Sequence, residues 1–79
     1  MYRTHTIDAV EFNGRAVLCR RDGLVLFGFW SSALSGWVRN ITDSEITLWS
    51  TKDLASTYAI MNRDRLLAAQ VVQGKQAQG

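Results

Sequence analysis

The sequence predicts a single small domain that is mainly β, and three observations point to this class. Asn13-Gly14 and Asp22-Gly23 are both dipeptides that favour the type I′ turn of a β-hairpin. Residues 24–30 are rich in Val, Phe and Trp, which are frequent in strands. The 79 residues contain no Pro and leave room for one domain only. We expect the domain to span residues 1–72 and the polar tail, residues 73–79, to be disordered.

The first predicted hairpin lies between and after the two turn dipeptides. Residues 15–21 have about the length of one strand, and residues 24–30 follow directly after Asp22-Gly23. Gly28 inside the second strand predicts a bulge, a bend or close backbone packing. A small closed barrel needs strong curvature of this kind.

Two further strands are expected after a break at residues 31–36. Residues 37–42 alternate imperfectly between apolar and polar side chains, whereas residues 45–50 alternate cleanly. Asp43 and Ser44 between them predict a turn, because an Asp side chain bonds readily to the backbone that follows it.

Residues 54–72 allow two interpretations. In the first, residues 56–61 form a strand, a helical turn follows, and residues 71–72 form a last strand. In the second, residues 54–70 form one helix. We favour the first, because β-branched and aromatic residues prefer strands, and the expected fold is then a five-stranded barrel with a short helical turn. For residues 6–12 the sequence leaves two alternatives: a short helix, or a strand that pairs across the following turn.

Catalytic chemistry is not predicted. His5 is the only imidazole, and no motif supports a triad of His5 with Ser31 or Ser32. Cys19 is the only thiol, so a zinc site lacks ligands. Arg20 and Arg21 would lower the pKa of a neighbouring thiol, but Cys19 lies in a predicted strand and is interpreted as a buried structural residue. The glycines form no phosphate-binding pattern. We therefore expect no enzyme, no metal and no cofactor.

Location and charge give weaker indications. Residues 1–6 lack the apolar run of a signal peptide, and the apolar run at residues 24–30 is far shorter than the about 20 residues of a membrane span. A free thiol without an export signal favours the cytoplasm. The net charge of +2 and the pI of about 9.1 suit a nucleic-acid partner and equally a soluble domain with a modest charge.

The predicted order of strands and turns resembles that of the Sm-like (Hfq/LSm) family. Residues 17–23 resemble the family's first strand and turn. Residues 36–48 resemble its Sm1 signature, which has a glycine, an alternating strand, an Asp turn and an apolar strand. Residues 58–67 resemble its second motif, a strand followed by a polar turn and a last strand. The resemblance implies an SH3-like barrel that binds RNA and forms a homo-oligomer through its strand edges.

The resemblance also implies which residues contact RNA, since two loops line the pore of the family's ring. In this chain they correspond to Asn40, Asp43 and Thr47 in the first loop, and to Asn62 and Arg63 in the second. Arg63 would pair with a phosphate, and Asn40 or Asn62 would read a base edge. Single-stranded RNA is commonly recognised by such loops.

Two other interpretations fit the sequence. The chain is a small protein-interaction module, such as a phage- or plasmid-type modulator of a larger host protein, or it is an assembly subunit. Trp30, Trp37 and Trp49 suit each interpretation, because Trp stacks on bases and also fills cores and protein interfaces.

Overall fold

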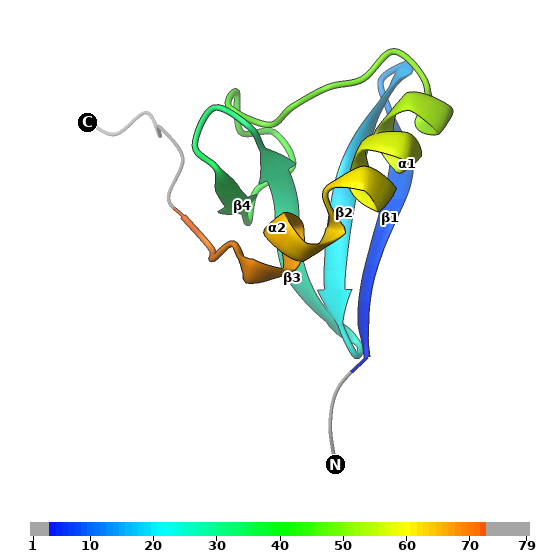
Figure 1. Cartoon of the computed structure of the whole chain (residues 1–79). Coiled ribbons are helices and arrows are strands. Elements are labelled where there is room, and N and C mark those ends of the chain that lie inside the picture. Colours follow the sequence, from blue (N-terminus) through cyan, green and yellow to red (C-terminus); the bar gives the residue numbers. More distant parts are fainter. Residues whose placement is uncertain (1–3, 73–79) are drawn as a thin grey trace, which may run out of the picture.

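The computed structural model describes residues 4–72 and shows an antiparallel four-stranded sheet with two short helices packed on it (Figure 1). The mainly β class is thereby confirmed. The sheet has the order β1-β2-β3-β4, and its strands are His5–Phe12 (β1), Arg15–Asp22 (β2), Val25–Ser31 (β3) and Gly36–Val38 (β4). The helices are Lys52–Met61 (α1) and Arg63–Ala68 (α2). The tail predicted to be disordered, residues 73–79, lies outside the described residues.

Both predicted hairpins are present, and the first has the predicted turn: Asn13 and Gly14 have φ angles of 52° and 77°, the left-handed conformation that both central residues of a type I′ turn require. The second turn lies one residue later than predicted. Asp22 pairs with Val25, so Gly23 and Leu24 are the central residues, and only Gly23 has a positive φ, 67°, which fits a type II′ turn. β1 and β2 pair without interruption from Phe12 opposite Arg15 to the far ends of both strands. Of the two interpretations of residues 6–12, the strand is therefore correct.

The sheet bends at a bulge between β2 and β3. The register shifts between Arg20 and Arg21, close to where Gly28 pairs. A Cβ atom on Gly28 would lie 2.9 Å from Trp37 Cβ and 3.0 Å from the Val38 carbonyl oxygen. Gly28 thus allows the backbone of β4 to approach β3 closely, as the sequence predicted.

The strand predicted at residues 37–42 is wrong beyond Val38. Asn40 Oδ1 accepts hydrogen bonds from the backbone nitrogen of Thr42 at 3.0 Å and from its hydroxyl at 2.8 Å. These local bonds turn the chain away from the sheet, as Asn side chains often do.

The segment at residues 45–50 does not form the predicted regular strand. Instead it makes isolated contacts with two separate strands. The Thr47 nitrogen donates to the Trp30 carbonyl at 3.0 Å, and the backbones of Trp49 and Ala16 exchange two bonds of 2.8 and 2.9 Å. β3 pairs with β2 only at residues 19–22 of β2, so the backbone of Ala16 is left to bond Trp49.

Residues 54–72 follow neither predicted interpretation. The strand expected at residues 56–61 is helical, and the single helix expected over residues 54–70 is two helices that meet at Asn62. The Thr51 hydroxyl accepts a hydrogen bond from the Leu54 nitrogen at 3.2 Å and caps α1. Asn62 ends α1, because its side-chain amide donates to the Tyr58 carbonyl at 3.0 Å.

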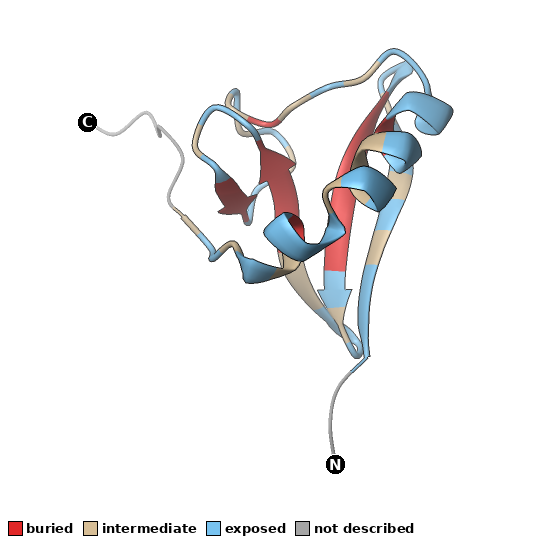
Figure 2. Ribbon diagram, in the orientation of Figure 1, coloured by how far each residue is buried: buried red, intermediate tan, exposed pale blue. Residues whose placement is uncertain are grey.

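Figure 2 shows buried stretches along β2, β3 and β4, and apolar side chains pack on both faces of the sheet. On the helix face, α1 and α2 cover a buried cluster of Ala16, Leu18, Trp30, Trp37, Ala55 and Leu66. On the opposite face, which we call the loop face, the buried cluster is Val17, Cys19, Phe29, Val38 and Ile46. The three Trp residues thus contribute to the core or its margin.

The two edges of the sheet differ. β4 has only three residues, and its outer side is occupied: the Trp37 nitrogen donates to the Gln70 carbonyl at 3.0 Å, and the Val72 nitrogen donates to the Trp37 carbonyl at 2.9 Å. The predicted last strand is thus reduced to a single bridge beside β4. β1 has eight residues, and within residues 4–72 no strand pairs with its outer side. A fifth strand and a closed barrel are not seen in that range.

Replacing Gly28 by Ala is expected to destabilise the domain by about 1–3 kcal/mol, the usual cost of overpacking, because the new methyl group meets backbone atoms of β4. Urea unfolding measures the effect. Gly14→Asn is the comparison variant: nothing lies within 4 Å of its Cβ position, so its cost comes only from the positive φ of 77°, which Asn adopts more readily than most residues, and its loss should be clearly smaller. Equal losses in both variants would contradict the proposed close approach of β3 and β4.

Candidate functional site

The first group of predicted site residues lies in the loop between β4 and α1, and its side chains bond to the protein itself. Asn40 holds the turn described above. Asp43 Oδ1 accepts from the Glu45 nitrogen at 2.7 Å. Thr47 Oγ1 accepts from the Ser32 nitrogen at 2.7 Å. These three side chains therefore shape the loop.

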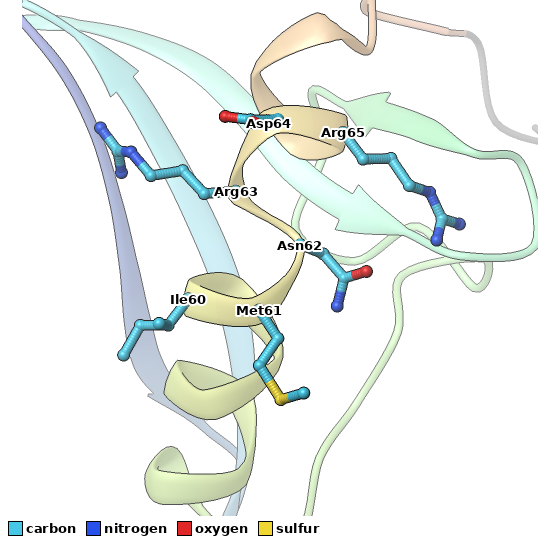
Figure 3. A pocket seen from close by; sticks show the side chains of 6 residues that line it. All are labelled: Ile60, Met61, Asn62, Arg63, Asp64 and Arg65. Carbon is cyan, nitrogen blue, oxygen red and sulfur yellow. The ribbon is translucent and has the colours of Figure 1, made fainter.

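The second group, Asn62 and Arg63, lies at the junction of α1 and α2 (Figure 3). Asn62 ends α1, whereas the side chain of Arg63 extends from the ribbon toward the sheet. A wide hollow of about 480 Å³ is lined by residues 60–65 at this junction. Arg65 points away from Arg63 in Figure 3, so the two cations do not form one compact patch.

The structure does not bring the two predicted groups together. Ile41 and Ile46, which lie beside the first group, pack in the cluster on the loop face. Tyr58 and Leu66, which flank the second group, pack in the cluster on the helix face. A single RNA site that combines both groups within one chain is therefore absent from the described residues.

Arg20 is a buried charged side chain, only 5 % exposed. Its guanidinium lies 3.9 Å from the centroid of the Phe27 ring. The Nη1 atom donates to the Leu66 and Leu67 carbonyls of α2 at 3.3 and 3.1 Å. Trp37 Nε1 donates to the same Leu66 carbonyl at 2.9 Å. A cation at the carboxyl end of a helix is favourable, so Arg20 fixes α2 to the sheet.

Asp22 neutralises this buried cation. Arg20 Nε donates to Asp22 Oδ1 at 3.0 Å, and His5 Nδ1 lies 2.8 Å from the same oxygen. Burial raises the pKa of Asp22, but the hydrogen bonds from Arg20 and His5 outweigh burial and hold that pKa below its ordinary value. The group contains an acid, a base and a cation, yet its contacts are those of an anchor between β2 and α2.

Nucleophilic and metal chemistry find no support in the described part of the chain. Burial raises the pKa of the Cys19 thiol, with a smaller opposing effect from Arg21, so the unreactive thiol form is favoured. Within residues 4–72, no group of three His, Cys, Asp or Glu side chains is placed to hold a metal ion.

Charge is balanced over the described residues. Arg3 and Lys75 lie outside them, and the remaining Lys and Arg residues equal the Asp and Glu residues in number. Arg20 is buried in its ion pair. The described residues therefore carry no net positive charge that would attract the phosphates of a nucleic acid.

β1 forms the long edge of the sheet, and within residues 4–72 no strand pairs with its outer side. Along a strand of an antiparallel pair, the backbone N–H and C=O groups of one residue bond the neighbouring strand, and those of the next residue point to the other side. The Gly23 nitrogen donates to the Thr4 carbonyl at 2.8 Å, so Thr4 and every second residue after it bond β2. The backbone N–H and C=O groups of Ile7, Ala9 and Glu11 consequently face outward.

A hollow of about 290 Å³ lies directly beside this edge, between β1 and α1. Its lining is mostly small or apolar and carries two charges: Ile7, Asp8, Ala9, Ser56, Ala59, Ile60 and Arg63. Ile60 is 76 % exposed. Sequence analysis missed this site, because it left residues 6–12 open between helix and strand. The strand pairing across Asn13-Gly14 was the signal that would have found it.

The chain matches no protein-family model, no curated protein and no solved structure. Neither α1 nor α2 has the length and hydropathy needed to cross a membrane.

Replacing Arg20 by Met is expected to destabilise the domain by about 3 kcal/mol, because Asp22 and the α2 carbonyls lose their buried partner. Arg21→Met is the matched control: Arg21 is adjacent but exposed, and its loss should cost less than about 0.5 kcal/mol. Urea unfolding compares the two variants. Similar values for both would show that Arg20 does not anchor α2.

The lowered pKa of Asp22 predicts a pH-dependent stability. Its contribution is fully present above the unfolded-state pKa, near 4, and is lost as the pH falls through the lower folded-state pKa. The stability advantage of the wild type over Asp22→Asn should therefore shrink below about pH 4. Urea unfolding at pH 7, 4 and 2.5 measures this. A constant difference over that range would argue against the depressed pKa.

Proposed function

We propose that this chain is a non-enzymatic protein-binding module that adds an extended polypeptide segment to β1. The observation that carries this proposal is the eight-residue edge strand whose outward backbone groups lie beside the hollow under α1. An unpaired edge is a template for another strand. We place the module in the cytoplasm, where its free Cys19 would stay reduced.

Strand addition divides affinity and specificity between backbone and side chains. Main-chain hydrogen bonds from Ile7, Ala9 and Glu11 would supply affinity, and a pocket for every second side chain of the partner supplies specificity. The hollow lies on the helix face, so it would receive side chains that point to that face. Ile60 at its rim is exposed and would lose apolar surface to water on binding.

Single-stranded RNA binding of the Sm-like kind is our second proposal. It is supported by the hollow at the helix junction, which Asn62, Arg63 and Arg65 line. An arginine can pair with phosphate and stack on a base. The balanced charge of the described residues makes this the weaker proposal.

The protein-binding proposal is tested with a phage-displayed library of random peptides selected on the purified chain. Selected peptides should bind at least about tenfold more weakly to Ala9→Pro, which removes one outward N–H and is tolerated at a sheet edge. Arg65→Ala is the control and should bind as the wild type does. Peptides whose affinity is indifferent to Ala9→Pro in a folded variant would contradict the proposal.

A fluorescence titration with a labelled oligoribonucleotide, at 50 and 200 mM salt, tests the second proposal. RNA binding through phosphates would weaken steeply between the two salt concentrations, and Arg63→Ala would weaken it further. The first proposal predicts no measurable binding at either concentration. Tight, salt-sensitive binding that needs Arg63 would replace the first proposal by the second.

A further inference from the structure

We propose that the segment added to β1 is β1 of a second copy of this chain, paired antiparallel with Ala9 opposite the Ala9 of the other copy. This inference rests on the proposed function and names its partner. The resulting dimer is a continuous sheet in which the two β1 strands lie at the centre and both β4 edges lie outside.

Symmetry limits the pairing to a few registers. A two-fold axis between antiparallel strands stands perpendicular to the sheet, so both copies keep their helices on the same side. Side chains that face each other across the axis must then lie on the same face of their own sheets. Ile7 and Ala9 lie on the helix face, so Ala9 can face Ala9, or Asp8 can face Asp8, but Ala9 cannot face Asp8.

Charge selects between these two central registers. With Asp8 on the axis, two carboxylates would stand directly opposite each other, and like charges so placed are destabilising. With Ala9 on the axis, Asp8 stands opposite Val10 of the second copy. The small Ala9 side chains then meet at the centre, where the two copies approach most closely.

The favoured register also pairs opposite charges across the interface. It places Glu11 of the second copy opposite Ile7, on the helix face. Arg63 lines the hollow together with Ile7, and its side chain extends toward the sheet in Figure 3. Arg63 therefore lies beside the position that the second copy's Glu11 would take, and symmetry creates the same ion pair twice.

The small size of the described domain gives an independent reason for self-association. A domain as small as residues 4–72 buries only about 60–65 % of its unfolded surface and is marginally stable. Cys19 is the only cysteine, so a disulfide within one chain is excluded. A dimer would cover Ile60 and the hollow and would satisfy the outward backbone groups of β1.

Charge reversal tests the predicted ion pair. Light scattering over a range of concentrations should show twice the 8.9 kDa of one chain. Arg63→Glu and Glu11→Arg should each weaken dimerisation about tenfold, and the double variant should recover most of the loss. Arg65→Glu changes the charge equally outside this hollow and should dimerise as the wild type does. If the double variant does not recover dimerisation, the proposed ion pair between Arg63 and Glu11 is wrong.

Cysteine trapping tests the register. In the Ala9→Cys variant the two sulfurs would lie across the axis, where opposite Cα atoms are about 5.5 Å apart, within the range for a disulfide. Oxidised glutathione should therefore cross-link Ala9→Cys. The Asp8→Cys variant and the wild type, whose Cys19 is buried, should stay uncross-linked. Cross-linking of Asp8→Cys in place of Ala9→Cys would overturn the proposed register.

The two proposals fail separately. A wild-type chain that remains a monomer at millimolar concentration would overturn self-pairing. If the selected peptides then still bind more weakly to Ala9→Pro, the proposed protein-binding function holds, but the partner is not a second copy of this chain. A monomer that also binds peptides without regard to Ala9→Pro would overturn both proposals.

Discussion

The buried guanidinium of Arg20 is the interaction on which the arrangement of the sheet and helices depends. It stacks on the Phe27 ring, pairs with Asp22 and donates hydrogen bonds to the Leu66 and Leu67 carbonyls at the end of α2. A buried charge is costly unless it is paired and fully hydrogen-bonded. Arg20 meets this condition only when α2 lies across the bend of the sheet, so one position of the helix is selected.

The position of α2 determines which parts of the sheet remain accessible. Residues 70–72 follow α2 directly and run along β4, so the anchored helix also leads the chain to cover that edge. α1 packs over β1 and β2 but leaves the outer side of β1 open. The fold therefore has one short covered edge and one long accessible edge. The long edge of β1 is the one at which we propose that a partner binds.

Sequence reasoning recovered the features that are set locally. The turn at Asn13-Gly14 and the bend at Gly28 depend on backbone conformation that the residue type dictates. A second turn was also expected near Gly23, but its centre is Gly23-Leu24 and not Asp22-Gly23. Sequence reasoning failed at residues 56–61, where strand propensity was overruled by helix caps and by burial of the helix on the sheet. The anchoring role of Arg20 could not be predicted either, since its carbonyl partners follow some 46 residues later in the chain.

Amide hydrogen exchange of β1, followed by NMR at increasing protein concentration, tests the central claim most directly. The amides of Asp8 and Val10 bond β2 and should be protected at every concentration. Those of Ile7, Ala9 and Glu11 face outward and should exchange rapidly in dilute protein and become protected as the concentration rises. Rapid exchange of these three at all concentrations would contradict self-pairing, and their protection in dilute protein would contradict the open edge itself.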